Sequence, residues 1–545
     1  MRTSRRILQA SLMSVLAIAG WLLTVQTLAA GTPPYSWGNN QAIVSGQAVN
    51  TQPNGLQASN GTLWLAYQSN LNTGSPSRFD VYIKTQTAGH WSPAIQRMTS
   101  NGYNSAPYLT QVQDGRIFLF WARQISSPSS LIYYSVFTNG AWAAPVSITQ
   151  TSLNDTQPSA AVGRDGTLYL VWTRVNSTCS TCTPSKHLYY KTLSLGSWSL
   201  ESLLTPPSDV NWNYGSSVSA SKDGRIWVVW SRGIFPAITL YYSYFNGTVW
   251  SSSTLITSST TVDEHPSMVQ DRNGTIWLFW GRQTCAPTYA LFNKFSKDNG
   301  ASWSPDSQMT SCASAIDSDE PVAVQGTDKY LHMFYVTDPV GADEIWELST
   351  LTQVYPVNDV AVTSLSANAT LIYPGGLASI GESSWVKLTT TLINLGDSSE
   401  AVTLTVSVSN TTTTNLGTQT FSLAVGASLT LNFYWNTSFN MKPGLYSLNA
   451  VASNSPGETV GNVADNTLTV RRSVHVLPPG DVDQDGSTTA VDVSQVKYAY
   501  GSQPCSLYPT NPVCSRFNPY FDINNDQFVG AIDISVTIAH YGIFT

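Results

Sequence analysis

Charged residues are scarce in this chain of 545 amino acids, in which Asp, Glu, Lys and Arg together make up only 11%. Solubility must therefore come largely from hydroxyl and amide side chains, a composition typical of β-rich proteins. No basic run follows the first six residues, and the formal net charge is -7. Since nucleic-acid binding needs a basic patch or stripe, we expect no nucleic-acid partner.

A long apolar run is found only at the start of the chain. Arg2, Arg5 and Arg6 precede an apolar stretch that ends in small residues near Ala30. This order is typical of a secretory signal peptide, which we place at residues 1–30. An uncleaved membrane anchor is the alternative, although the apolar run is short for a bilayer span. We therefore expect a secreted, extracellular protein, attached to the cell surface if this segment is retained.

Cysteine is rare as well, with six residues in the chain. They form three local couples: Cys179 with Cys182, Cys285 with Cys312, and Cys505 with Cys514. An even number in an exported chain points to disulfides. The Cys179-Ser-Thr-Cys182 couple would also suit a redox pair or half of a zinc site. No second CxxC or histidine pair lies nearby to complete four ligands, which favours the disulfide.

One ten-residue phrase, DGRIFLFWAR at 114–123, recurs along the first two thirds of the chain. Its six copies start at positions 60, 114, 165, 223, 273 and 328, so that successive copies lie 50 to 58 residues apart. This period is within reach of propeller repeats and too long for helical repeats. Apolar runs such as IFLFW at 117–121 predict strands that are covered on both faces.

Each repeat contains further strands around this phrase. A proline-led segment comes before it, and a Tyr-rich and a Trp-led strand follow, as at 157–163, 188–193 and 197–204. Four short strands joined by turns describe one blade of a β-propeller. The sixth unit lacks its fourth strand, and residues 35–45 resemble the fourth strand of another unit. We predict six blades over residues 32–354, closed by pairing of the N-terminal strand with the last blade.

The segment Ser296-Lys297-Asp298-Asn299-Gly300-Ala301-Ser302-Trp303 matches the Asp-box S-x-D-x-G-x-[ST]-W. On these residues the region resembles the sialidase and BNR-repeat propellers. The Asp-box is a folding motif, and in that family it lies opposite the active site. Sialidase-like enzymes clamp a substrate carboxylate with three arginines, and they use a Tyr activated by Glu as nucleophile and an Asp as acid/base. The resemblance implies a glycan or glycoconjugate ligand and, if such a set is present, a sialidase-like glycoside hydrolase.

An arginine closes four copies of the phrase: Arg123, Arg174, Arg232 and Arg282. If the second strand of each blade returns to the functional face, all four reach the propeller mouth. There they would face a series of polar residues, namely Asn50, Asn104, Asp155, Asn213 and Asp263. Because guanidinium groups suit bidentate binding of carboxylates, the four arginines are candidate substrate-binding residues. The alternative is architectural, since a repeated feature also suits ion pairs that hold blades together.

Carboxylates that break the repetition are the candidates for catalysis. Glu264 and His265 replace small or polar residues in the fifth unit, and Asp317, Asp319 and Glu320 crowd the opening of the sixth. Crowded carboxylates raise one another's pKa, as acid/base work on a glycosidic bond requires. The candidate catalytic residues are therefore Glu264, Asp319 and Glu320. A solvated acidic rim without function is the alternative.

Trp212 and Tyr214 replace the proline-led entry of the fourth unit. Their flat faces suit sugar rings, which makes them further candidates for substrate binding. No Tyr and Glu couple stands out as a nucleophile, so the sequence leaves catalysis unassigned. A non-catalytic adhesion or scaffold protein, whose propeller only recognises a ligand, is the second functional hypothesis.

Alternating strands with a turn every dozen or so residues follow the repeats. This pattern predicts an Ig-like β-sandwich over residues 357–476. The opening Asp359-Val360-Ala361-Val362, the Asn394-Leu395-Gly396 turn, Trp435 and the segment Ala464-Asp465-Asn466-Thr467 resemble the CARDB family. The resemblance implies a spacer or adhesion module without catalytic residues.

Residues 480–545 contain two loops with oxygen ligands at positions 1, 3, 5, 7 and 12, the spacing that surrounds a hard cation. The ligands would be Asp481, Asp483, Asp485, Ser487 and Asp492 in the first loop, and Asp522, Asn524, Asp526, Phe528 and Asp533 in the second, with carbonyl oxygens at position 7. One predicted helix follows each loop, and the pair resembles a type I dockerin. The resemblance implies two calcium ions and a cohesin-like protein partner, bound through positions 10 and 11, here Ala490, Val491, Ala531 and Ile532.

Two features depart from the dockerin pattern. Gln527 stands where the loop favours glycine, and a left-handed turn costs a side chain about 1 to 2 kcal/mol, so we expect weaker binding of the second ion. An insertion from Cys505 to Cys514 lengthens the interval between the loops. The predicted fold class is therefore mainly β: a six-bladed β-propeller, an Ig-like β-sandwich and a small α-helical calcium-binding dockerin-like module.

Overall fold

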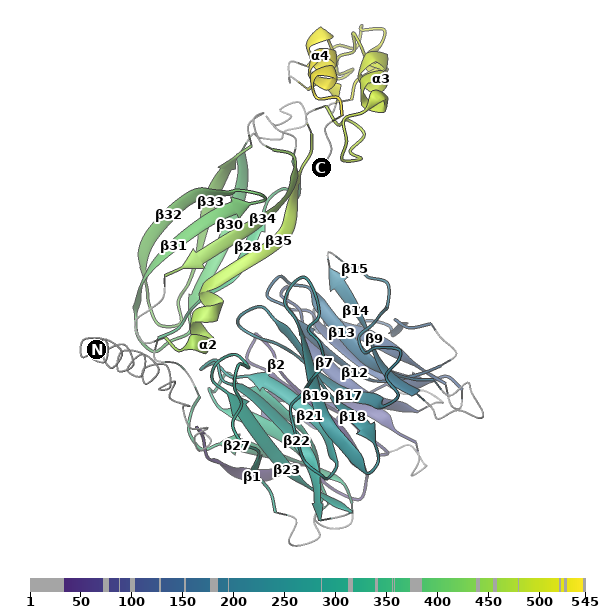
Figure 1. The fold of residues 1–545 in the computed structure, drawn as a ribbon, viewed down its shortest axis with the longest axis vertical. Coiled ribbons are helices and arrows are strands. Elements are labelled where there is room, and N and C mark those ends of the chain that lie inside the picture. Colours follow the sequence, from purple (N-terminus) through teal and green to yellow (C-terminus); the bar gives the residue numbers. More distant parts are fainter. Residues whose placement is uncertain are drawn as a thin grey trace, which may run out of the picture.

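The computed structural model describes residues 34–542 except for 72–77, 88, 99–102, 127–128, 151–152, 177–184, 195, 286, 312–316, 339–341, 355, 357, 373–384, 438–441, 454–457, 479, 519–520 and 524–526. The chain is mainly β, and two α-helices of nine residues each lie near its C-terminus (Figure 1). Within the described part, no helix is long and apolar enough to span a membrane. The expected signal peptide, Cys179, Cys182 and Cys312 lie outside the described residues.

Strands β1 to β27 form the six blades. Blade one contains β2 (Asn50–Gln57), β3 (Leu63–Ser69), β4 (Asp80–Thr87), β5 (His90–Trp91) and β6 (Ile95–Met98). Blade two contains β7 (Asn104–Gln111), β8 (Ile117–Gln124), β9 (Ser130–Thr138), β10 (Ala141–Trp142) and β11 (Val146–Ser147). Blade three contains β12 (Asn154–Val162), β13 (Leu168–Asn176), β14 (Ser185–Ser194), β15 (Ser197–Trp198) and β16 (Ser202–Leu203).

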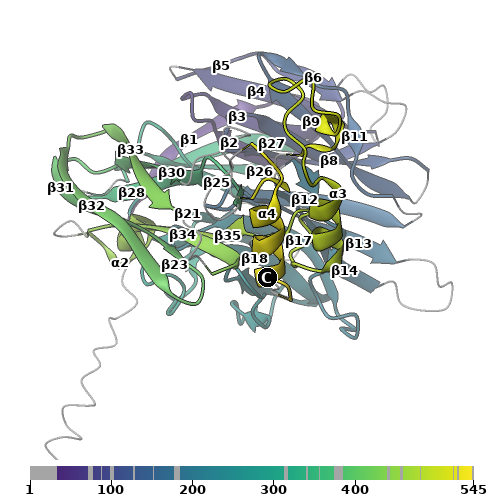
Figure 2. The ribbon, with the colours of Figure 1, turned by 90° about the horizontal axis from the view of Figure 1, so that it is seen from above.

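The remaining blades have four strands each. Blade four contains β17 (Trp212–Ala220), β18 (Ile226–Ile234), β19 (Ala237–Phe245) and β20 (Thr254–Leu255). Blade five contains β21 (Asp263–Gln270), β22 (Ile276–Cys285), β23 (Thr288–Ser296) and β24 (Ser307–Gln308), and blade six contains β25 (Ser318–Gln325), β26 (Leu331–Thr337), β27 (Glu344–Thr350) and β1 (Trp37–Val44). The first strands β2, β7, β12, β17, β21 and β25 contact one another in this order, and β25 returns to β2. The sheets therefore close into a propeller, with the outer strands fanned around these six (Figure 2).

The N-terminal strand closes the ring. β1 pairs antiparallel with β27, from Trp37 opposite Thr350 to Val44 opposite Ile345, which confirms the predicted closure. The Gln41 amide also donates to Glu347 Oε2 at 3.0 Å. The last blade thus has its full set of strands, and β27 has no unpaired edge.

The repeated phrase forms the second strand of each blade and supplies most of the propeller core. All seven residues of β3 are buried, as predicted for a strand covered on both faces. The repeated tryptophan is also anchored to the first strand of its own blade. The indole nitrogens of Trp121, Trp230 and Trp280 donate to Asn104, Asn213 and Asp263 at 3.2, 2.8 and 3.2 Å. A buried indole N–H favours such a partner, but in the described structure the indole nitrogen of Trp172, the equivalent residue of blade three, has none.

Residues 358–476 form two facing sheets around one core. The first sheet has the order β28 (Val360–Ala367), β30 (Trp385–Asn394) and β33 (Ser428–Asn436), and the second has the order β29 (Leu371–Ile372), β35 (Thr467–Val476), β34 (Gly444–Ala452), β31 (Glu400–Ser409) and β32 (Thr413–Leu423). Burial alternates along β31, and Trp435 is among the largest side chains of the shared core. The observed alternation is that of a sandwich with one solvated face on each sheet.

Two propeller turns fasten the propeller to this sandwich. The Arg164 guanidinium donates to the carbonyl oxygens of Val362, Ala464 and Asp465 at 2.7, 3.2 and 2.8 Å. Lys222 Nζ lies 3.0 Å from carboxylate oxygens of both Asp359 and Asp465. We call the contacts of Arg164 and Lys222 with the sandwich the joint.

Helices α3 (Ala490–Tyr498) and α4 (Ala531–Ala539) each follow one of the acidic loops. The two halves exchange backbone hydrogen bonds: Gly501 N donates to Val529 O and Gly542 N to Thr488 O, each at 2.8 Å. The Cys505–Cys514 disulfide is present, as predicted. The Cys285–Cys312 pairing stays a prediction because one of its members is not described.

Candidate functional site

The six inner strands share a bulge near their start. At each bulge one residue has a positive φ: Gln52 (52°), Ala106 (51°), Gln157 (51°), Gly215 (60°), His265 (52°) and Glu320 (51°). The strand pairing shifts register at these positions in every blade. A left-handed conformation is unfavourable for side chains other than glycine, and bulges that re-aim side chains are frequent beside functional sites. Sequence analysis missed this feature, although a proline follows five of the six residues.

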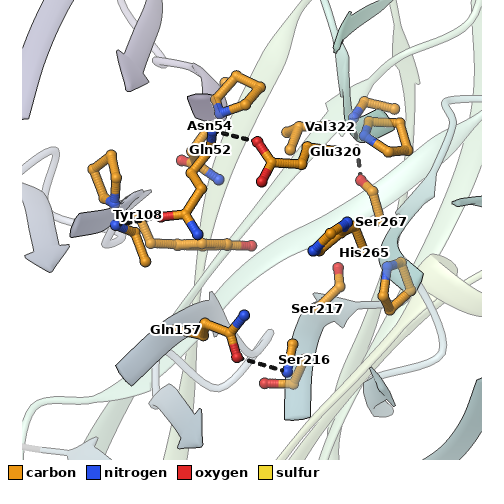
Figure 3. Close-up of a pocket in the computed structure, with 18 of the residues that line it drawn as sticks. Gln52, Asn54, Tyr108, Gln157, Ser216, Ser217, His265, Ser267, Glu320 and Val322 are labelled. Atoms are coloured by element: carbon orange, nitrogen blue, oxygen red, sulfur yellow. Dashed lines mark hydrogen bonds between the residues drawn. The ribbon is translucent and has the colours of Figure 1, made fainter. Parts of the chain in front are cut away.

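The bulges surround a cavity of about 150 Å³ on the propeller axis (Figure 3). Hydrogen bonds between neighbouring blades hold its wall: Gln52 N donates to Glu320 Oε2 at 2.5 Å, and Ala106 N donates to Gln52 Oε1 at 2.8 Å. Gly215 N donates to Gln157 Oε1 at 3.1 Å. Figure 3 shows Glu320 and His265 facing this space from adjacent strands. The cavity is therefore asymmetric, with its carboxyl and imidazole groups on blades five and six.

His265 forms an ion pair with Asp319 of the next blade, with 2.8 Å between Nδ1 and Oδ2. Burial alone would lower the pKa of His265, but the Asp319 carboxylate outweighs it and raises this pKa to about 10. Burial raises the pKa of Glu320 to about 7, with His265 opposing the rise and Asp319 adding to it. At neutral pH the site thus holds an imidazolium and a carboxyl group near its midpoint of titration.

Glu264 is held between two tyrosines. Tyr289 Oη donates to Glu264 Oε2 at 2.9 Å, and Tyr214 Oη donates to Oε1. Burial and then Glu264 raise the pKa of both phenols above their ordinary value. Lys186 Nζ lies 4.1 and 4.5 Å from the ring centres of Trp212 and Tyr214, so the faces expected to receive a sugar contact this ammonium instead.

Gly281 makes room for this cluster. A Cβ atom there would fall 1.9 Å from Asp319 Oδ1 and 3.4 Å from the Tyr289 ring. The other five copies of the phrase carry Gln, Ala, Thr, Ser or Val at this position. The structure thus brings Glu264, Asp319 and Glu320 to the mouth of the same two blades. Tyr289 and Lys186, which sequence analysis did not single out, join them.

The repeated arginines do not converge on the cavity. Arg174 pairs with Asp155 and Glu201 at 2.6 and 2.7 Å. Arg232 pairs with Asp209 at 2.8 Å.

The other two arginines are also engaged beside their own blades. Arg282 pairs with Asp263 at 2.6 Å and with Asp306 at 2.7 Å, while the Arg123 guanidinium lies 5.2 Å from the Tyr133 ring centre. Their assignment as substrate-binding residues is therefore corrected for Arg174, Arg232 and Arg282, because carboxylates beside them hold their guanidinium groups in ion pairs. Among the described arginines of the phrase, no carboxylate clamp is formed.

The first acidic loop gathers three carboxylates. Oxygens of Asp481, Asp483 and Asp485 lie within 4.8 Å of one another. Asp481 Oδ1 is buried and has no hydrogen-bond partner in the described part of the chain, and burial, with Asp492 and Asp485 adding to it, raises the Asp481 pKa to about 6. An unpaired buried carboxylate among acidic neighbours fits a hard divalent cation.

Asp492 lies at position 12 and caps α3 with its carboxylate. Its Oδ1 accepts from Val482 N at 2.8 Å and its Oδ2 from Thr489 N at 2.7 Å. Asp533 repeats this arrangement in the second loop with Ile523 N and Gly530 N, at 2.7 and 2.6 Å. Ser487 and Phe528 stand at position 7 of the two loops, whereas Asn524 and Asp526 lie outside the described residues.

The residues expected to bind a partner open the two helices. Ala490 and Val491 begin α3, and Ala531 and Ile532 begin α4. The side chains of Val491 and Ile532 are 52% and 57% exposed, so both are accessible apolar groups. A shallow hollow follows α4 from Ile532 to His540.

Comparisons with known proteins give little guidance. No family model matches the sequence, and no curated protein sequence matches it significantly. Among solved structures, a protein of unknown function from Dyadobacter fermentans is 12% identical, with a TM-score of 0.49 over 59% of this chain and 100% of its own. A Hadza microbial sialidase is 14% identical, with a TM-score of 0.44 over 56% and 66%. The α-L-arabinofuranosidase of Fusarium graminearum is 15% identical, with a TM-score of 0.44 over 58% and 98%. Similarity at this level carries no argument about the chemistry of this chain.

Proposed function

We propose that this protein binds carbohydrate at the mouth of its propeller. The observation that carries the proposal is the constellation of Glu264, Tyr214 and Tyr289 beside the His265–Asp319 pair. Carboxylate, phenol and imidazolium groups offer both donors and acceptors to sugar hydroxyls, and a cavity adjoins them. Because Arg174, Arg232 and Arg282 are held in ion pairs, the ligand needs no carboxylate of its own.

Hydrolysis of a glycosidic bond is the second candidate function. The pair of Tyr289 and Glu264 is the observation that favours it, since a carboxylate that accepts from a phenol can remove its proton and make it a nucleophile. Glu320, with its pKa of about 7, is poised to donate a proton to a leaving group. The ion-paired arginines favour recognition without catalysis, the adhesion alternative.

Glycan-array binding and turnover of fluorogenic glycosides by the full chain test both candidates. Glu264→Gln and Glu320→Gln should weaken binding, while Asp114→Asn, on an exposed turn, should leave it unchanged. Binding without turnover supports recognition alone. Turnover that both mouth variants abolish supports the hydrolase. The absence of binding to any glycan contradicts the proposal.

We further propose that the C-terminal loops bind calcium and attach the protein to a cohesin-like partner outside the cell, with the sandwich as a CARDB-like spacer. Asp481, Asp483 and Asp485 would hold the first ion, which would order the loop by neutralising their charge. The matched cap at Asp533 supports a second site. Helix content measured by circular dichroism should rise with calcium in the wild type and not in a variant that combines Asp481→Ala with Asp522→Ala. An equal rise in this variant contradicts the proposal.

A further inference from the structure

A cleft opens where the propeller meets the sandwich, on the side of the propeller opposite its mouth. Its volume is about 570 Å³, within the usual range for ligand sites, which occur preferentially at domain boundaries. The turns at Arg164 to Thr167 and Asn246 to Gly247 form one wall. Residues Thr467 to Ser473 of β35 form the other. We call this space the junction cleft.

The joint fixes the two walls of the junction cleft. Arg164 is held by sandwich carbonyls, and Lys222 is held between Asp359 and Asp465. The backbones also approach closely nearby, because a Cβ on Gly274 would fall 2.5 Å from Gly461 Cα. A ligand would therefore meet a preformed site and would not have to order two separate domains.

Two adjacent arginines line the sandwich wall. The region from 357 to 476 has only four Lys or Arg residues, and Arg471 and Arg472 are two of them. Arg472 has a φ of 47°, at an irregular stretch of β35 that interrupts its pairing with β34. A strained residue of this kind persists only where its surroundings fix it, and such residues cluster at functional sites.

Neither arginine forms an ion pair with a described carboxylate, and both side chains are exposed. A Cβ on Gly247 would fall 3.2 Å from Arg471 Nε, so the Arg471 side chain lies against the opposite wall. Two carboxylates line the junction cleft: Asp223 pairs with Arg225, and Asp165 accepts from Thr167 at 3.0 Å, which leaves its negative charge in place. Arg164 lines the cleft as well, so three guanidinium groups outnumber the two carboxylates. The positive charge of Arg471 and Arg472 is therefore in excess there.

We propose that the junction cleft is a second ligand site, for an oligosaccharide that carries carboxylate or sulfate groups. Guanidinium forks match the planar geometry of a carboxylate and also bind sulfate oxygens. Hydroxyl side chains along both walls, such as Thr167, Ser194, Thr370 and Ser473, suit the hydroxyls of sugar rings. The site lies outside the propeller mouth and does not depend on the function proposed there.

Isothermal titration of the full chain tests this assignment with three probes: trigalacturonate, a sulfated trisaccharide and neutral galactotriose. The acidic probes should show a salt-sensitive binding event that the neutral probe lacks. Replacing both arginines, by Arg471→Gln with Arg472→Asn, should weaken binding at least about tenfold. Asparagine is chosen because it tolerates a positive φ. The stronger of the two acidic probes identifies the anion.

Two variants serve as controls. Arg116→Gln removes an exposed arginine outside the junction cleft and should bind the acidic probes like the wild type. Arg471→Lys keeps the positive charge but loses the bidentate guanidinium group, so its affinity for the acidic probes should lie between those of the wild type and Arg471→Gln. This comparison of single variants remains valid if the double variant is unstable. Equal binding by Arg471→Gln and the wild type, or equal binding of galactotriose and trigalacturonate, overturns the proposal.

Discussion

The His265 imidazole and the Asp319 carboxylate join blades five and six across 2.8 Å. The folded state raises the pKa of His265 to about 10, because Asp319, Glu320 and Glu264 outweigh the effect of burial. The contribution of this pair to the free energy of unfolding is fully present below the ordinary histidine pKa of about 6.5, and it is lost as the pH rises toward about 10. Asp319→Asn should therefore lower the melting temperature more at pH 6 than at pH 10.

The matched control for this measurement is His90→Gln, which alters an exposed histidine on β5. Its melting temperature should differ from the wild type by the same small amount at both pH values. A loss in Asp319→Asn that does not vary between pH 6 and pH 10 would contradict the ion pair.

Gly281→Ala should disturb the mouth by steric conflict, since the new Cβ would fall 1.9 Å from Asp319 Oδ1. We expect a loss of about 1 to 3 kcal/mol in the free energy of unfolding, typical of overpacking. Denaturant titration measures this loss. The double variant with Asp319→Ala removes the colliding atoms, so the alanine at 281 should cost much less there. Equal costs in both backgrounds would show that the strain arises elsewhere.

Lys222→Ala should destabilise the joint by about 3 to 5 kcal/mol, because two buried carboxylates lose their cation. Burial and the neighbouring Asp465 already raise the pKa of Asp359 to about 7, even with Lys222 present. Lys329 provides a control, since it also reaches a sandwich aspartate, Asp397, but both side chains are more than a third exposed. Lys329→Ala should cost no more than about 1 kcal/mol. Thermal and chemical unfolding of the full chain would show the difference, and similar losses would contradict the special role of Lys222.

Gln527→Gly should tighten the proposed second calcium site. Gln527 has a φ of 66°. This conformation costs a residue with a side chain about 1 to 2 kcal/mol, whereas glycine adopts it without this cost. Calcium titration calorimetry should therefore show one of two binding events becoming several-fold tighter. Adding Asp522→Ala should remove that event. If the tighter event persists in the combined variant, it belongs to another site.

The propeller could be predicted because its determinants are local and repeated. The apolar run of each second strand, the turn before it and the spacing of copies are visible in the sequence, and together they require stacked four-stranded sheets. Pairing of Trp37 to Val44 with the last blade followed from a missing strand at one end and a spare strand at the other.

The site was harder to predict because it depends on contacts between blades. Tyr289 follows no motif, and its importance arises only when β23 places it beside Glu264 of β21. The arginines were misassigned because the sequence does not show that Asp209, Glu201 and Asp306 lie within reach of them. The positive φ angles of residues such as Gln52 and His265 could not be predicted from residue type, because only one of the six positions is glycine.

The N-terminal strand finds its partner only at the other end of the propeller, with 306 positions separating Gln41 from Glu347. At a synthesis rate of about 5 to 20 residues per second, a ribosome needs roughly 15 to 60 seconds to make that stretch. Until then the growing chain can form only an incomplete, open propeller, and β1 remains without its partner strand. A truncated chain that ends before β27 would leave β1 unpaired and the open edge of the incomplete propeller exposed to neighbouring chains.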